Sequence, residues 1–264
     1  LDMPFERTVN SGKPDFPFCL GWANHDWTTK TWEKGKGRSK DTMIFKQEYL
    51  GDEDYIMHFN QFLKAFKDDR YIKVDGKLLF LVFNPFGIPD VKHFTELWNK
   101  LAKENGLEGF HFVASNSAPK LKLDSTTSSF ENDYKKKIEG TRALGFDAVM
   151  TSNQKNAELK VAGKFKKILN SVIRRFMPSL YVEKYSYKKI IENLYTNLDK
   201  RNDVYPQLLA GWDRSPRSGR KAIVYYGTTP ETFKYAGEMA VKQVENKEPD
   251  HKIIFLNSWN EWGE

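Results

Sequence analysis

Two glutamates near the end of the sequence, Glu261 and Glu264, are the residues best placed to do acid–base chemistry. They stand three positions apart and follow the apolar run at residues 253–256, which has the composition of a buried strand. On an extended strand such positions point to opposite faces, whereas in a helical turn their Cβ atoms are about 5–6 Å apart. Carboxyl groups about 5–5.5 Å apart are what retaining glycoside chemistry uses. The alternative is an exposed glutamate pair after an edge strand, since glutamate is usually exposed.

Aromatic and amide side chains gather at the ends of the predicted strands. Six of the seven tryptophans lie at or just past such an end: Trp22, Trp27, Trp32, Trp212, Trp259 and Trp262. Amide and carboxylate side chains follow the same strands: Asn24, Asn84, Asn116, Asn153, Asp213 and Asn260. Flat apolar rings with a few polar groups suit a sugar, which has apolar ring faces and hydroxyl edges. Tryptophan also packs well in a core without any ligand, so a purely structural interpretation stays open.

The elements that must position these side chains alternate along the chain. Strands are predicted near residues 18, 79, 111, 148, 208 and 254, and helices at 53–66, 91–104, 187–198 and 230–245. A hairpin with a primed turn at Asp75-Gly76 precedes the strand at 77–83, a short strand is expected at 44–47, and residues 124–129 are expected to form a loop. This alternation predicts the α/β class with a parallel sheet.

Six strands fit either an open doubly wound sheet or an eight-stranded (β/α)8 TIM barrel that lacks its first one or two βα units in this chain. The strand-end tryptophans favour the barrel, because barrel active sites are built at those ends. The length of 264 residues fits one domain covering residues 1–264. Because the sequence begins at Leu1 and ends inside the predicted site at Glu264, we interpret it as a fragment of a longer protein.

The composition excludes several classes of function. The single cysteine, Cys19, allows no internal disulfide, which agrees with a reducing compartment such as the cytoplasm. The five histidines are scattered and no phosphate-binding glycine loop is present, so we expect no metal and no cofactor. The acidic run at residues 52–54 has the D-x-D form used by metal-dependent transferases, but it opens a helix, and we interpret Asp52 as its N-cap.

The net charge of +7 is concentrated in one segment. Residues 155–189 hold ten Lys/Arg and two Asp/Glu, so the rest of the chain is nearly neutral and nucleic acid is not an expected partner. Within this segment, residues 164–177 have one apolar stripe: Phe165, Ile168, Leu169, Val172, Ile173 and Phe176. Such a helix packs on a sheet or lies on an anionic membrane surface, which would place the protein at the periphery of the inner membrane.

Three motifs carry a resemblance to a known family. They are KPDFPFCLGWAN at residues 13–24, GWDRSPR at 211–217 and NSWNEWGE at 257–264. In this order they resemble the WbsX-type family of bacterial polysaccharide-biosynthesis proteins, which are commonly labelled glycosyltransferases and are similar to family 99 glycoside hydrolases, the endo-α-mannosidases. The resemblance implies a (β/α)8 barrel whose first one or two βα units lie upstream of Leu1.

The same resemblance implies roles for individual residues. Glu261 is similar to the residue that takes the proton from the sugar 2-hydroxyl, so that this hydroxyl attacks the anomeric carbon, and Glu264 is similar to the general acid. Two like charges close together separate their pKa values, which lets one carboxyl be protonated while the other is ionised. The substrate-binding residues that we expect are Trp22, Asn24, Asp26, Trp27, Asn84, Asn116, Trp212, Asp213, Arg217, Trp259, Asn260 and Trp262.

The chain departs from the family pattern at positions that would touch the substrate. His25 and Asp26 replace the usual Glu-Asn, Arg214 stands where asparagine is usual, and Gly263 replaces a histidine common in the hydrolases. The expected function is a carbohydrate-active enzyme that makes or cleaves glycosidic bonds of a bacterial surface polysaccharide, lipopolysaccharide O-antigen or capsule, with an oligosaccharide or lipid-linked glycan as its substrate. The alternatives are an endo-acting glycoside hydrolase and a non-catalytic polysaccharide-binding module.

Overall fold

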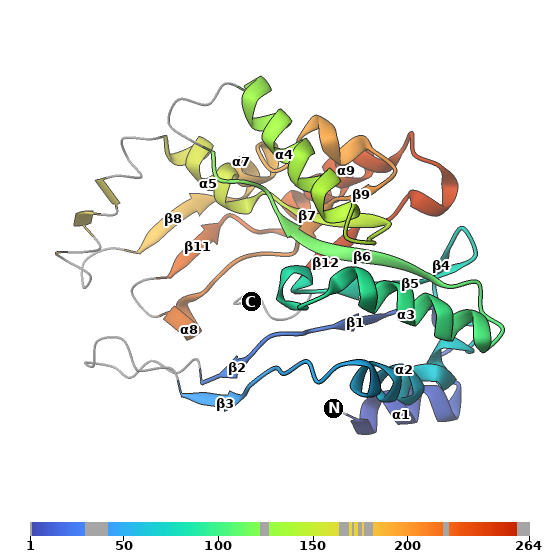
Figure 1. The fold of residues 1–264 in the computed structure, drawn as a ribbon. Coiled ribbons are helices and arrows are strands. Elements are labelled where there is room, and N and C mark those ends of the chain that lie inside the picture. Colours follow the sequence, from blue (N-terminus) through green and yellow to red (C-terminus); the bar gives the residue numbers. More distant parts are fainter. Residues whose placement is uncertain are drawn as a thin grey trace. The chain divides into compact units, whose positions relative to one another are not determined.

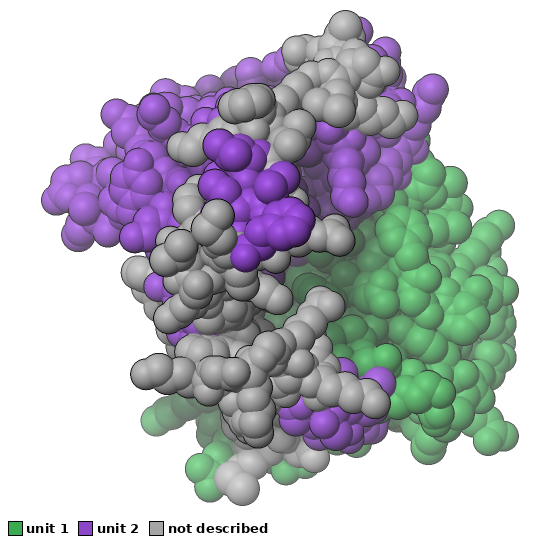
Figure 2. Space-filling model, turned by 90° about the vertical axis from the view of Figure 1, so that its left-hand side faces the viewer, with its two compact units in different colours: residues 1–26, 46–115, 139–149 green, residues 27–45, 116–138, 150–264 purple. Residues whose placement is uncertain are grey.

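The computed structural model has two compact units, which Figure 2 shows in different colours. Unit 1 contains residues 1–26, 46–115 and 139–149, and unit 2 contains residues 27–45, 116–138 and 150–264. The structure describes residues 2–29, 42–121, 127–163, 169–170, 172–173, 176, 182–218 and 222–257.

Unit 1 is built on a parallel sheet with helices beside it (Figure 1). Its parallel strands, in sheet order, are β1 (Leu20–Trp22), β5 (Lys77–Val82), β6 (Phe110–Ser117) and the first part of β7 (Ala148–Ser152). The short strand β4 (Lys73–Val74) pairs antiparallel with β5. Asp75 and Gly76 join β4 to β5 with φ angles of 50° and 77°, so the predicted primed turn is confirmed.

The helices of unit 1 bury an aromatic core. They are α1 (Asp2–Ser11), α2 (Asp52–Phe66) and α3 (Val91–Glu104), with the 3-10 turn η1 (Pro85–Gly87) after β5. The core rings are at most 1% exposed and belong to Phe59, Phe66, Phe80, Phe94, Trp98, Phe110 and Phe112. Trp98 also donates its indole N–H to the carbonyl oxygen of Tyr55 at 3.1 Å. The predicted helices at 53–66 and 91–104 are therefore confirmed.

The start of α2 corrects one prediction. The N-cap is Gly51, whose φ of 94° is a conformation that side chains disfavour, and Asp52 is the first helical residue. The Asp52 carboxylate lies 2.6 Å from Nε2 of His93. An acidic residue in the first turn still favours the positive end of the helix dipole, which accounts for the acidic run at this position.

Unit 2 contains several short strand pairs. They are the antiparallel pair β2 (Trp27–Thr28) with β3 (Met43–Phe45), the parallel pair β8 (Glu183–Ser186) with β11 (Ile223–Tyr226), the parallel pair β10 (Gln207–Leu209) with β12 (Phe255–Asn257), and β9 (Val204–Tyr205) next to the second part of β7. The predicted strands near 148, 208 and 254 are confirmed. The pair of β8 with β11 was not predicted, because β8 reads Glu-Lys-Tyr-Ser and this polar composition hides its burial.

The helices of unit 2 cover a second core. They are residues 127–138 of α4 (Thr127–Arg142), α5 (Gln154–Ala162), α7 (Tyr187–Glu192) and α9 (Pro230–Val244), with the short turns η2 (Asn197–Lys200), α8 (Ser215–Ser218) and η4 (Pro249–His251). The core residues include Tyr185, Tyr187, Ile190, Ile191, Leu209 and Tyr225. The helix predicted at 230–245 is confirmed, and its N-cap Thr229 accepts from the backbone N–H of Thr232.

One helix prediction and one loop prediction in unit 2 were wrong in extent. The helix predicted at 187–198 ends at Glu192, because Thr196 and Asp199 form a capping box that starts the separate turn η2. The loop predicted at 124–129 overlaps the start of α4 at Thr127. Most of the predicted helix at 164–177 lies outside the described residues.

The observed mixture of helices and parallel strand pairs confirms the α/β class with a parallel sheet. Closure of eight strands into a barrel stays a prediction. In the part of the chain that the structure describes, no helix has both the length and the apolar character needed to cross a bilayer.

Candidate functional site

The predicted site residues divide between the two units and the undescribed end of the chain. Unit 1 holds Trp22, Asn24, Asp26 and Asn84, and unit 2 holds Trp27, Asn116, Trp212, Asp213 and the backbone of Arg217. The remaining predicted residues lie outside the described residues: Trp259, Asn260, Glu261, Trp262 and Glu264, together with the side chain of Arg217.

Asn24 joins the ends of two neighbouring strands in unit 1. Its side chain is fully buried, and its amide oxygen accepts from the backbone N–H of Asn84 at 2.7 Å. The amide nitrogen donates to the Asn84 carbonyl at 2.7 Å and to the Tyr49 hydroxyl at 3.0 Å. These bonds hold the chain beyond β1 against the chain beyond β5. Asn24 thus has a structural task, and its contact with a sugar stays a prediction.

Trp22, at the end of β1, packs among aromatic side chains of unit 1. Its ring centroid lies 4.8 Å from the His58 ring and 5.8 Å from the Tyr49 ring, both in edge-on geometry, and 5.5 Å from the Phe94 ring. Burial lowers the pKa of His58 to about 4, so its imidazole is neutral at pH 7. The indole is half-buried, so part of its surface remains accessible. Stacking of Trp22 on a sugar ring stays a prediction.

An exposed aromatic pair lies beyond the ends of β1 and β5. The His25 and Phe83 rings are 5.0 Å apart, and Phe83 is 52% exposed. Next to His25, the exposed Asp26 carboxylate accepts from the backbone N–H of Gln47 at 2.8 Å. We did not include His25 and Phe83 among the expected substrate contacts. Both residues directly follow predicted parallel strands, and the carboxyl ends of such strands lie at one edge of a sheet. This position could have identified them as candidate substrate contacts.

In unit 2, Trp212 follows β10 and lies between an aromatic ring and a cation. Its carbonyl accepts from the Tyr225 backbone N–H at 2.8 Å, and the two rings are 6.3 Å apart. The Arg214 guanidinium carbon lies 5.8 Å from the Trp212 ring centroid, within cation–π range. The buried indole N–H of Trp212 has no hydrogen-bond partner among the described residues. Within the part of the chain that the structure describes, this N–H is therefore an unsatisfied donor in the interior of unit 2.

The other predicted residues of unit 2 occupy different environments. Asp213 accepts from the backbone N–H of Ser215 at 2.8 Å and so starts α8. Asn116 is buried in β6, whereas Trp27 is 44% exposed in β2. Because the structure does not relate unit 1 to unit 2, these residues are not assembled with Asn24 and Asp26 into one site.

Two buried carboxylates of unit 2 were missed by the sequence analysis. Glu158 of α5 is 5% exposed and accepts from the Tyr225 hydroxyl at 2.8 Å, and Glu183 of β8 is 1% exposed and accepts from the Tyr185 hydroxyl. Burial, followed by the charge of Glu158, raises the pKa of Tyr225. Glutamate is usually exposed in helices and strands, so residue type and spacing did not indicate that Glu158 and Glu183 are buried.

The register between β10 and β12 concerns the predicted glutamate pair. The two strands are parallel, and Leu209 is the partner of Asn257. Trp212 lies three residues beyond Leu209, and Glu261 lies four residues beyond Asn257. The register itself is described only as far as Asn257, and both glutamates lie outside the described residues.

A family model described as "Glycosyltransferase WbsX" matches residues 1–264. The chain belongs to this WbsX glycosyltransferase family. The predicted family resemblance is thus confirmed over the whole sequence. Two curated relatives, both described as uncharacterized protein WxcX, come from two strains of Xanthomonas campestris pv. campestris. Each is 22% identical over 267 residues, which is 100% of this chain and 34% of the relative.

The WbsX-family chain thus spans about one third of the length of these relatives. Among solved structures, a glycoside hydrolase-like protein is similar, with a TM-score of 0.47 and 13% sequence identity. The similarity covers 80% of this chain and 53% of that protein. Closure of eight strands into a barrel therefore stays a prediction.

Proposed function

We propose that this WbsX-family chain is part of a carbohydrate-active enzyme that makes or cleaves glycosidic bonds of a bacterial surface polysaccharide. The observation that supports this most directly is the parallel register of β10 and β12. A chain advances by at most about 3.5 Å per residue, so the four residues from Asn257 to Glu261 can span no more than roughly 14 Å. Asn257 is the partner of Leu209. Trp212 and Asp213 leave β10 at the same edge and would provide the sugar platform.

In the proposed mechanism, Glu261 accepts the proton of the sugar 2-hydroxyl while that oxygen attacks the anomeric carbon. Glu264 donates a proton to the departing glycosidic oxygen, so the bond breaks without release of an alkoxide. Glu264 then takes a proton from water or from a sugar alcohol, whose oxygen bonds to the anomeric carbon as the bond between that carbon and the 2-oxygen breaks. Glu261 returns its proton to the 2-oxygen, so the 2-hydroxyl is restored and both carboxyl groups regain their starting protonation states. Water gives hydrolysis and an alcohol gives transfer, so one arrangement serves either an endo-acting hydrolase or a transferase. General acid and base groups each contribute about 10²–10⁴-fold.

Separate Glu261→Gln and Glu264→Gln variants test these roles. Bacterial surface polysaccharide is incubated with each variant, and new reducing ends or transfer products are measured by mass spectrometry. We expect each variant to lose at least about 100-fold in turnover while oligosaccharide binding is retained. Glu248→Gln, at an exposed glutamate before η4, is the control and should keep full turnover. Full turnover in either test variant contradicts the mechanism, and binding without turnover by the unaltered chain identifies a binding module.

We further propose that residues 155–189 contact an anionic membrane, as a lipid-linked glycan substrate at the inner membrane would require. Three apolar side chains of the segment are exposed: Leu169 by 45%, Val172 by 47% and Phe176 by 72%. Basic residues of the same segment add attraction to anionic lipid. Sedimentation should be greater with phosphatidylglycerol vesicles than with phosphatidylcholine vesicles.

The matched variants are Leu169→Ser with Phe176→Ser, and the control is Val241→Ser, at a residue of α9 that is 52% exposed. The double variant should sediment less with the anionic vesicles, whereas the control should behave like the unaltered chain. Equal sedimentation with neutral and anionic vesicles would remove the membrane contact.

A further inference from the structure

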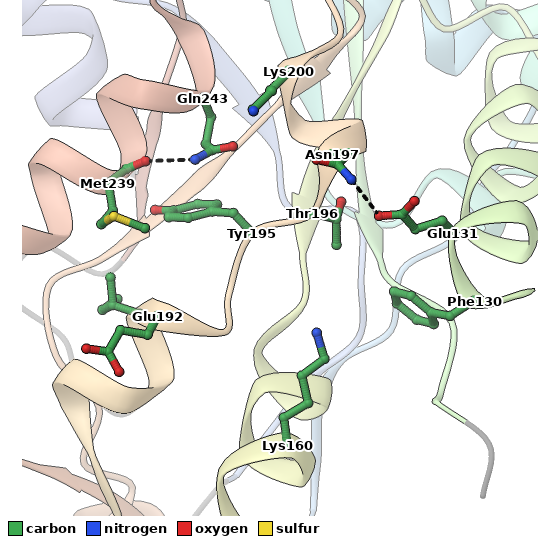
Figure 3. A pocket seen from close by; sticks show the side chains of 11 residues that line it. Phe130, Glu131, Lys160, Glu192, Tyr195, Thr196, Asn197, Lys200, Met239 and Gln243 are labelled. Atoms are coloured by element: carbon green, nitrogen blue, oxygen red, sulfur yellow. Dashed lines mark hydrogen bonds between the residues drawn. The ribbon is translucent and has the colours of Figure 1, made fainter. Parts of the chain in front are cut away.

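A pocket of about 290 Å³ opens in unit 2 among its helices (Figure 3). Its lining comes from α4, α5, α7, η2 and α9, and from the turn between α7 and η2. The volume is close to the lower end of small-molecule sites, which begin near about 300 Å³. None of the predicted substrate contacts lines it.

The lining combines an apolar wall with polar groups. The apolar lining residues are Tyr195, Ile191, Met239 and Phe130. Tyr195 and Met239 lie near each other, with Phe130 on another side (Figure 3). The Tyr195 hydroxyl donates to the carbonyl of Gln207 at 3.1 Å, so the ring is held in place. A fixed aromatic ring with aliphatic neighbours is a surface on which the C–H face of a sugar ring packs at low entropic cost.

The polar groups of the pocket are also held by hydrogen bonds. Asn197 donates to the Glu131 carboxylate at 3.2 Å, and Gln243 donates to the carbonyl of Met239 at 3.0 Å (Figure 3). Thr196 is fixed by the capping box with Asp199. Because these groups are preorganised, little ordering is needed when a ligand binds.

The charges of the lining select against an ionic ligand. Lys160 and Lys200 are positive, and Glu131 and Glu192 are negative, so the formal charges cancel. Among the described residues, none of these four side chains forms an ion pair. An anion would meet two carboxylates and a cation would meet two ammonium groups. A hydroxyl both accepts from lysine and donates to glutamate, so a neutral polyhydroxylated ligand satisfies the lining.

We propose that this pocket is a second carbohydrate site that binds one neutral sugar unit. The assignment follows from the lining and does not depend on the proposed roles of Glu261 and Glu264. A glycan held here would be retained by the protein while another part of the same molecule, or a second molecule, is processed elsewhere.

Methyl NMR of the 264-residue chain gives a local readout, because Met239 lines the pocket and is one of six methionines. The chain is labelled with ¹³C-methyl methionine, and the Met239 signal is assigned with Met239→Leu. The neutral probes are the methyl glycosides of mannose, galactose and rhamnose, and the anionic comparators are glucuronate and inorganic phosphate. We expect a saturable shift of the Met239 signal with at least one neutral probe, and none with the comparators.

Asn197→Trp places an indole at the pocket wall and should weaken the binding of that probe by at least about tenfold. Asn246→Trp adds the same side chain at an exposed position outside the pocket and should leave binding unchanged. If Asn197→Trp does not fold, Lys160→Ala is used, and it should also weaken binding.

The site is overturned if no neutral probe shifts Met239, if phosphate or glucuronate alone shifts it, or if the pocket variants bind as well as Asn246→Trp. Loss of turnover in Glu261→Gln would leave the Met239 titration unchanged. Failure of the pocket and failure of the proposed enzyme are therefore separate results.

Discussion

Acidification should destabilise unit 1 through His58, whose ring contacts the predicted substrate-binding residue Trp22. The imidazole is surrounded by rings at centroid distances of 4.8 Å to Trp22 and 5.2 Å to both Phe62 and Trp98. Burial lowers its pKa from 6.5 to about 4, and the charge of Asp54 opposes this only in part. Protonation would place an imidazolium charge among aromatic rings, which is costly because the charge has lost its contact with water.

The sign follows from proton counting. Between pH 4 and 6.5 the unfolded chain binds a proton at His58 that the folded chain does not, so stability falls as the pH falls through this window. Each pH unit inside the window is worth about 1.4 kcal/mol. The loss is therefore about 2 kcal/mol on reaching pH 5, and about 3 kcal/mol over the whole window.

The assay is urea unfolding at a series of pH values from neutral to about pH 4.5, for the unaltered chain and for His58→Phe. The variant keeps a ring and cannot titrate, so the difference between the two chains isolates His58 from the carboxylates. His93→Gln is a control of opposite sign. The hydrogen bond that His93 donates to the Asp52 carboxylate raises the pKa of His93, so its stabilisation is present below pH 6.5 and is lost as the pH rises through the raised value.

Equal pH dependence in the unaltered chain and in His58→Phe would refute this argument. A pKa near 6.5 for His58, measured by NMR of the buried imidazole, would independently refute the role of His58 in this pH dependence. A pH dependence that is lost in His58→Phe would show that His58 packs against Trp22 as a neutral ring.

Two further predictions concern single residues of known environment. Asn24→Ala should lower the free energy of unfolding by about 2–3 kcal/mol, because it removes the hydrogen bonds between the ends of two strands. Urea unfolding measures the loss, and a loss below about 0.5 kcal/mol would contradict a stabilising role for these hydrogen bonds. Gly145→Ala should cost at least about 2 kcal/mol, since its φ is +104° and a Cβ would lie 2.3 Å from the Thr95 hydroxyl oxygen. Gly140→Ala, in α4 with open space around it, should instead raise the melting temperature, and the same result at both glycines would contradict the prediction.

The periodicity of the sequence was sufficient for most elements of unit 1, but the helix α1 was not predicted. Apolar residues at helical spacing predicted both α2 and α3, and Asp75-Gly76 predicted the hairpin, because these patterns depend only on residues close together in the sequence. The helix α4 was missed, since its buried residues Phe130, Tyr134 and Ile138 are separated by charged residues that lower the apolar signal.

The candidate site was less predictable, because its geometry depends on contacts distant in sequence. Asparagine often binds sugar hydroxyls, yet both polar atoms of the Asn24 amide are hydrogen-bonded to the backbone of Asn84, sixty positions away. The burial of Glu158 depends on Tyr225, which is 67 positions away. Residue type and spacing locate strand ends, but they do not tell which polar groups at those ends are already satisfied by the protein.

The interleaving of the two units constrains how the protein can be divided. Each unit is drawn from three separate stretches of the chain, and β6, α4 and β7 each contribute residues to both. A terminal deletion therefore cannot release either unit intact, and a cut inside any of these elements leaves an interrupted helix or strand in both parts. Gene fragments encoding half of this region would give incomplete cores, so exchange between relatives should conserve the whole stretch as one inherited block.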